Sequence, residues 1–176
     1  MRYAYYANLK PRQRAVYRRS DETVKLLLPN RPALARLAAA IDKALETQDR
    51  ALIERASRAL AEGIAAAFEV PPVRVKVLSR RPSTSESELH GLYETRDGRA
   101  PAVIRVWMRT AQHKRVVAFR TFLRTLLHEL CHHLDYELLR LEDSFHTEGF
   151  FKRESSLFYQ LVPRPEGMGP NRRDDR

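Results

Sequence analysis

The sequence contains very little cysteine, and this scarcity excludes several kinds of protein. Cys131 is the only cysteine among 176 residues, so the chain can form no internal disulfide and no multi-cysteine zinc knuckle. No apolar run approaches the roughly 20 residues that a helix needs to cross a bilayer. The opening sequence MRYAYYANLKPRQR lacks the apolar core and cleavage site of a signal peptide. We therefore expect a cytoplasmic protein with no membrane-spanning segment.

Acidic residues are also scarce, and the resulting positive charge is unevenly distributed. The chain has 32 Lys and Arg against 22 Asp and Glu, a net charge of +10. Residues 1–35 have eight basic and two acidic residues, and residues 72–123 have eleven and four, whereas residues 124–162 have four and seven. Basic surfaces attract polyanions by releasing counterions, so DNA or RNA is an expected partner. A basic bias that only serves solubility explains the charge equally well.

Composition and hydrophobic pattern divide the chain into three parts. Residues 1–31 alternate aromatic and basic side chains without a sustained period, which predicts an N-terminal extension that docks partly on the remainder. Residues 32–162 predict one domain with a single hydrophobic core. Residues 163–176 are rich in proline, glycine and arginine, and they predict a flexible C-terminal tail.

The periodicity of apolar residues predicts helices around a small sheet. Helical spacing occurs in three segments, at residues 32–68, 115–138 and 148–161. The first segment breaks near residues 47–49, so it forms two helices or one bent helix. Alternating valines from Val73 to Val77 predict a strand, and two more strands flank a turn at residues 96–99. The order predicts an α+β fold with a three-stranded sheet, antiparallel or mixed.

The sequence HELCH, at residues 128–132, has the form HExxH within a strongly helical segment. Residues four apart share one face of an α-helix, so His128 and His132 can reach a single cation. Glu129 lies about 100° around the helix from His128, close enough to act on a metal-bound water as a general base without ligating the metal. Neutral imidazole suits zinc, although histidine sites also bind manganese and other divalent ions.

The context of this motif strengthens the prediction of a metal site. Leucines at helical spacing from Leu123 to Leu127 bury the helix and place the histidines in a cleft beside the core. A strand that ends near Thr110 precedes the helix, and we expect it to be the edge strand along which a substrate lies. His146 follows His132 by fourteen residues, enough for the chain to turn back with a third ligand. Three imidazoles leave a fourth position open to water, as in catalytic zinc sites.

The identity of the third ligand has an alternative. His146 could be an ordinary loop histidine, with Glu148 or Glu154 as the third ligand instead. Both glutamates follow the motif in the sequence.

The stretches HELCHHLD and HTEGFF together resemble the compact metallopeptidases of the SprT-like group and their WLM-type relatives. In that family HExxH is followed by a third histidine that opens a motif of the form H-(G/S/N/T)-x-x-(F/W), which His146, Thr147 and Phe150 match here. The resemblance covers roughly residues 32–161. Thr147 replaces the commoner glycine, and the family's C-terminal zinc ribbon is missing because the cysteines are absent.

The resemblance implies a minimal zincin fold, in which the small sheet packs on the HExxH helix between N-terminal and C-terminal helices. It implies Zn²⁺ as the cofactor, Glu129 as the catalytic base, and three metal ligands, His128, His132 and His146. The implied mechanism has zinc acidify a bound water while Glu129 takes the proton and passes it to the leaving amine. One further donor would stabilise the oxyanion, and the candidates are Tyr93, His90 and Tyr136.

Other polar residues near the motif predict supporting roles. Asp135 lies almost back on the ligand face, where it could orient an imidazole N–H, and Asp143 could do the same for His146. A helix-surface acid and a loop acid are the plain alternatives. His133 points away from the ligand face, so we expect it to be structural or to support the ligands from behind. We expect Cys131 to be a small core residue.

Together these observations predict a zinc-dependent metallopeptidase that hydrolyses peptide bonds in a protein or peptide substrate, including proteins bound to nucleic acid. The alternative is a nucleic-acid adaptor with little catalytic activity, in which zinc is structural and the basic segments bind DNA or RNA.

Overall fold

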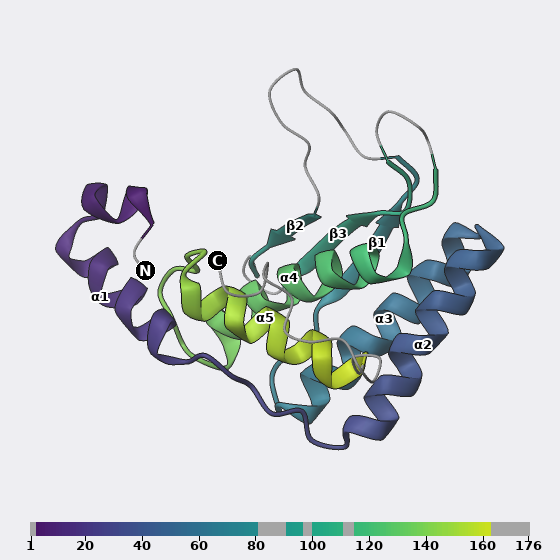
Figure 1. The fold of residues 1–176 in the computed structure, drawn as a ribbon, viewed down its shortest axis with the longest axis horizontal. Helices are drawn as coiled ribbons and strands as arrows, with labels where there is room; N and C mark the ends of the chain where they lie inside the picture. Colours follow the sequence, from purple (N-terminus) through teal and green to yellow (C-terminus); the bar gives the residue numbers. More distant parts are fainter. Residues whose placement is uncertain (1–2, 81–90, 97–99, 111–114, 163–176) are drawn as a thin grey trace, which may run out of the picture.

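The computed structural model describes residues 3–80, 91–96, 100–110 and 115–162, which form five α-helices, a short 3-10 helix and one three-stranded sheet (Figure 1). These elements confirm the predicted α+β class. His90, most of the predicted turn at 96–99 and the predicted tail lie outside the described residues. Within the described residues, no helix is both long and apolar enough to cross a membrane.

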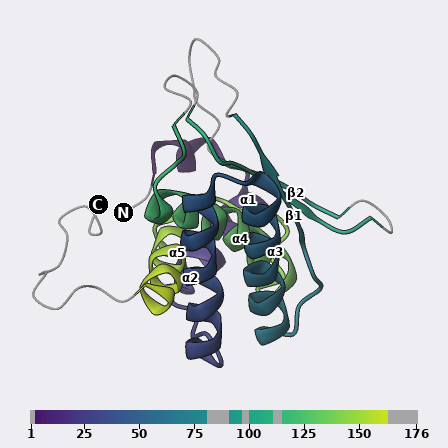
Figure 2. The same ribbon diagram turned by 90° about the vertical axis from the view of Figure 1, so that its right-hand side faces the viewer.

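The Ala- and Leu-rich segment forms two helices, α2 (Arg31–Thr47) and α3 (Arg50–Ala67). Gln48 adopts the left-handed conformation, with φ of 57°, and ends α2. The carboxylate of Asp49 then accepts hydrogen bonds from the first N–H groups of α3 and caps it. The break therefore falls where the sequence predicts it, and the two helices lie side by side (Figure 2).

The sheet is mixed, with strand order β1-β3-β2. Its strands are β1 (Arg74–Leu78), β2 (Gly91–Glu94) and β3 (Val103–Trp107). β1 runs parallel to β3, whereas β2 runs antiparallel to it. Valines and isoleucines alternate toward helices α3 and α4 and are completely buried, at Val75, Val77, Ile104 and Val106.

The prediction that the strand before the HExxH helix is an edge strand is wrong. That strand is β3, and it lies in the centre of the sheet because β1 pairs with it in parallel on one side and β2 pairs with it on the other. The edge strand next to the histidines is β2, which packs directly against the HExxH helix.

Helices α4 (Phe119–Glu137) and α5 (Glu148–Leu161) position the histidines. α4 packs on β2 and β3, and α5 packs on α4 and α2 (Figure 1). Cys131 is fully buried in the core that these elements share, as predicted. His128 and His132 lie at the margin of this core and are half-buried.

The N-terminal segment contains regular structure that the sequence pattern does not predict. A 3-10 helix, η1 (Ala4–Asn8), leads into α1 (Pro11–Glu22), which packs against α5. Only Val16, Tyr17 and Ser20 of α1 are buried. Because this buried face is narrow and partly polar, the sequence of α1 shows no clear amphipathic period.

Candidate metal centre

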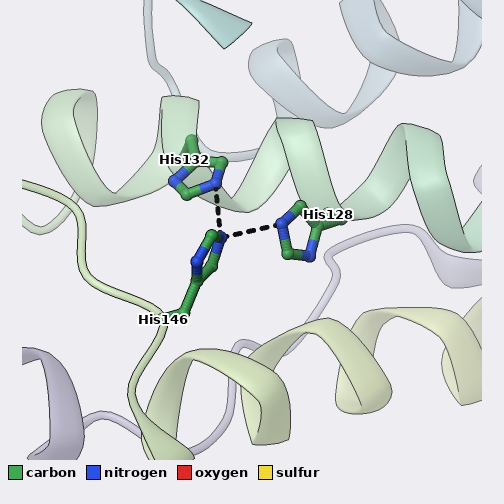
Figure 3. A group of neighbouring side chains, drawn as sticks. All are labelled: His128, His132 and His146. Carbon is green, nitrogen blue, oxygen red and sulfur yellow. Dashed lines mark hydrogen bonds between the residues drawn. The ribbon is translucent and has the colours of Figure 1, made fainter. Parts of the chain in front are cut away.

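Three histidines converge beside the C-terminal half of α4. His128 and His132 project from successive turns of α4, and His146 comes from residues 138–147, the segment between α4 and α5 that we call the metal loop (Figure 3). Nε2 of His146 lies 2.9 Å from Nε2 of His128 and 3.1 Å from Nε2 of His132. Tetrahedral zinc with ordinary bond lengths holds its nitrogens about 3.3 Å apart. The ligand atoms of the three histidines all lie within 4.8 Å of one another, so side-chain adjustments would let them share one ion.

Hydrogen bonds on the far side of two rings fix their tautomers. Nδ1 of His128 lies 3.0 Å from a carboxylate oxygen of Glu154, which can only accept, so this nitrogen carries the proton. Nδ1 of His132 lies 2.7 Å from the hydroxyl of Ser144, and that hydroxyl donates to Asp135 at 2.8 Å. Ser144 therefore accepts from His132. Both Nε2 atoms are left with lone pairs directed at His146.

This arrangement of lone pairs suits a cation. A neutral His146 can offer Nε2–H to only one of its two neighbours, so at least one lone pair in the cluster has no donor. Burial and the imidazoles of His128 and His146 lower the pKa of His132 to about 3, and burial also lowers the pKa of His146. Neutral imidazoles are the form that binds zinc.

The alternative third ligands occupy other positions. Glu148 forms an ion pair with Lys152 at 2.7 Å on the surface of α5. Glu154 lies behind His128 and contacts the nitrogen that faces away from the cluster. Glu154 is therefore placed to orient the ring of His128, and the sequence gives no signal for this beyond its position on the inner face of α5.

Asp135 and Asp143 act on the histidines less directly than the sequence predicts. Asp135 is completely buried and reaches His132 only through Ser144, while its other oxygen accepts from the guanidinium of Arg153 at 2.7 Å. Asp143 accepts the backbone N–H of Ser144 at 2.9 Å and so supports the metal loop rather than an imidazole. Sequence reasoning missed Ser144, because nothing near it in the sequence reveals that it bridges two residues of α4.

Glu129 is buried beside the histidines under the edge strand. A Cβ on Gly91 would lie 2.4 Å from a carboxylate oxygen of Glu129, so only glycine permits β2 to approach this closely. The carboxylate also accepts the backbone N–H of Tyr93. Burial raises the pKa of Glu129 to about 7, which suits a group that takes and returns protons near neutral pH.

Both described candidates for an oxyanion donor, Tyr93 and Tyr136, already make side-chain hydrogen bonds. Nε2 of His133 lies 2.8 Å from the carbonyl oxygen of Pro71, so it is protonated and Nδ1 must accept. The hydroxyl of Tyr93 lies 3.1 Å from that Nδ1 and therefore donates to it. Tyr136 stacks on Tyr93 and lines the same pocket as the histidines. Its hydroxyl bonds to Asp143, and burial raises the pKa of Tyr136. His133 is buried and structural, as predicted.

An open cavity of about 670 Å³ joins these groups. The three histidines and Glu129 line it on one side, and the edge strand lines it on the other, through Gly91, Leu92 and Tyr93. A volume of this size is within the range of ligand-binding clefts and accommodates a short stretch of peptide. Comparison with known proteins adds no assignment: no family model matches the chain, and no curated protein or solved structure is significantly similar to it.

Proposed function

We propose that this protein is a zinc-dependent metallopeptidase of the SprT-like type, with His128, His132 and His146 as metal ligands. The observation that carries the proposal is the pair of fixed tautomers on α4, which direct two lone pairs at a third imidazole next to a buried carboxylate. Three protein ligands leave one coordination position for water or substrate, whereas structural zinc sites are closed by four.

In this proposal each residue of the site has a separate role in hydrolysis. Zinc would supply a Lewis acid that polarises the scissile carbonyl and acidifies water. Glu129 can hold a proton on its carboxylate and deliver it to the leaving amine. The N–H of Tyr93 fixes the orientation of that carboxylate, and Tyr136, which lines the cavity and also bonds to Asp143, is the hydroxyl we assign as donor to the oxyanion.

Metal content and cleavage test the proposal together. Wild type should contain about one zinc per chain by elemental analysis, and His146→Ala should lose it. Glu129→Gln should keep the zinc but cleave fluorescein-labelled casein at least about a hundredfold more slowly. Glu137→Gln, on the same helix but outside the cavity, is the matched control and should retain both properties.

Three results would argue against this function. An absence of zinc in wild type after zinc is added back would remove the metal centre. Zinc retained by His146→Ala would assign the third ligand elsewhere. Full cleavage by Glu129→Gln would show that the metal site is not where hydrolysis occurs.

A second candidate function is nucleic-acid binding with zinc in a structural role. It is favoured by the outer face of the sheet, where Arg74 and Lys76 are exposed and Lys76 pairs in register with Arg105. Replacing Arg74 and Lys76 by alanine should weaken binding of a DNA oligonucleotide and flatten its salt dependence. The same change at Arg36 and Lys43, exposed on α2, is the control. Equal binding by both double variants would remove this surface from consideration.

A further inference from the structure

The N-terminal segment holds the metal loop from outside. The hydroxyl of Tyr5, in η1, donates to the backbone carbonyl of His146 at 2.9 Å. Arg19, in α1, forms an ion pair with Glu142 at 3.0 Å and donates to the carbonyl of Arg140 at 3.2 Å. The metal loop contains no helix or strand of its own, so contacts like these determine where it lies.

The end of α1 rests directly on the first turn of α5. Asp21 accepts the backbone N–H of Gly149 at 2.7 Å, and the hydroxyls of Ser20 and Thr147 lie 3.3 Å apart. A Cβ on Gly149 would lie 2.6 Å from the carbonyl oxygens of Ser20 and Asp21. Because these are backbone atoms, they could not move aside without displacing α1. The contact begins one residue after His146.

A buried arginine connects the same end of α1 to a second ligand. The guanidinium of Arg153 is completely buried, and it donates to the carbonyl and the hydroxyl of Ser20. It also donates to Asp135 at 2.7 Å. Asp135 accepts from Ser144, which in turn accepts from His132. The chain of hydrogen bonds therefore runs from α1 through the core to the metal centre.

We propose that residues 4–22 form a strut that positions the third ligand, His146, and thereby sets the affinity and geometry of the metal site. The strut contributes no ligand. Its residues are positioning residues, of which Tyr5 acts on the backbone of His146 and Ser20 acts through Arg153. This inference rests on the metal centre of the proposed function, but it does not require that the protein cleave peptides.

Two substitutions weaken the strut without changing a proposed ligand or a residue that lines the cavity. Gly149→Ala forces α1 away from α5, and Tyr5→Phe removes only one exposed hydroxyl. The matched controls are Gly63→Ala, where the new Cβ meets only side-chain ends in α2, and Tyr6→Phe, whose hydroxyl contacts Arg18 instead of the metal loop. Urea unfolding of each metal-free protein reports whether the fold persists.

Zinc affinity, from competition with a chromophoric chelator, and the visible absorption of the cobalt-substituted protein are the measurements. Tyr5→Phe should bind zinc about two- to tenfold more weakly. Gly149→Ala should bind at least about tenfold more weakly, with a changed cobalt spectrum, because the spectrum reports the arrangement of ligands rather than overall stability. Both controls should match wild type.

The outcomes separate the strut from the metal centre. If wild type binds zinc and both strut variants bind it equally well with the same cobalt spectrum, the strut is wrong and the metal centre remains. If wild type binds no zinc, both are wrong. Weaker binding by the strut variants, with unchanged controls and intact metal-free folds, supports the strut.

Discussion

Helix α4 and the metal loop bring imidazoles to the same point by different means. On α4 the spacing of His128 and His132 follows from helical geometry, and a core of leucines fixes the helix. The metal loop has no such repeating geometry, and His146 is placed by contacts with Tyr5 and with the start of α5. The spacing of the two α4 imidazoles is thus determined locally, although Glu154 and Ser144 fix their tautomers, whereas the position of His146 depends on residues far away in the sequence.

The difference shows where the site can be weakened without removing a ligand. Changes on α4 that preserve the helix should leave its two imidazoles in place. Changes that disturb the supports of the metal loop should lower metal affinity even when they lie outside the cavity. Three substitutions test this contrast, and they are given from the largest expected effect to the smallest.

Asp135→Ala should have the largest effect, because Asp135 supports both halves. It would leave the buried guanidinium of Arg153 without its carboxylate and lower the free energy of unfolding by about 3–5 kcal/mol. Urea unfolding of the metal-free protein measures this. Glu142→Ala breaks the exposed pair with Arg19 and should cost no more than about 1 kcal/mol. Similar losses in the two variants would contradict the central position of Asp135.

Ser144→Ala should have an intermediate effect, confined to the metal centre. It removes the acceptor of the Nδ1 proton of His132, so the ring loses its fixed tautomer, and zinc affinity should fall about 10- to 100-fold. Chelator competition measures the change, with Ser155→Ala on α5 as the control. An unchanged affinity would show that α4 alone orients His132, and the two halves of the site would then be independent.

Thr147→Ala should have the smallest effect. Thr147 caps α5 by accepting the N–H of Phe150 at 3.0 Å, and losing a cap costs about 1 kcal/mol. Urea unfolding should show this loss, whereas Thr121→Ala on the exposed side of α4 should change the midpoint little. If Thr121→Ala proves the more damaging, the metal loop and the start of α5 are not the weaker half.

The parts of the site predicted from the sequence are those with a local signature. The HExxH spacing predicts that His128 and His132 lie together, and the structure brings His146 to them as predicted. The break between α2 and α3 and the extent of α5 are also as predicted from the spacing of apolar residues, and in the structure Asp49 and Thr147 cap the two helices.

The supports of the site were not predictable, because their partners are distant in the sequence. Asp135 resembles an ordinary helix acid until α5 brings Arg153 to it. The role of Ser144 depends on two residues of α4, and the helix α1 is stabilised by packing against α5 rather than by a pattern of its own. The pairing of β1 with β3, which puts β3 in the centre of the sheet, likewise depends on contacts between segments that are distant in the sequence.

The proposed strut also bears on the order in which parts of the protein fold. Its partners in the metal loop follow it by 121 to 141 positions along the chain, and at usual rates of translation that delay is on the order of ten seconds. Contacts between such distant residues form late in folding. Local turns of the HExxH helix can form before these distant contacts hold His146, so in the proposed metal centre the third histidine would be positioned last.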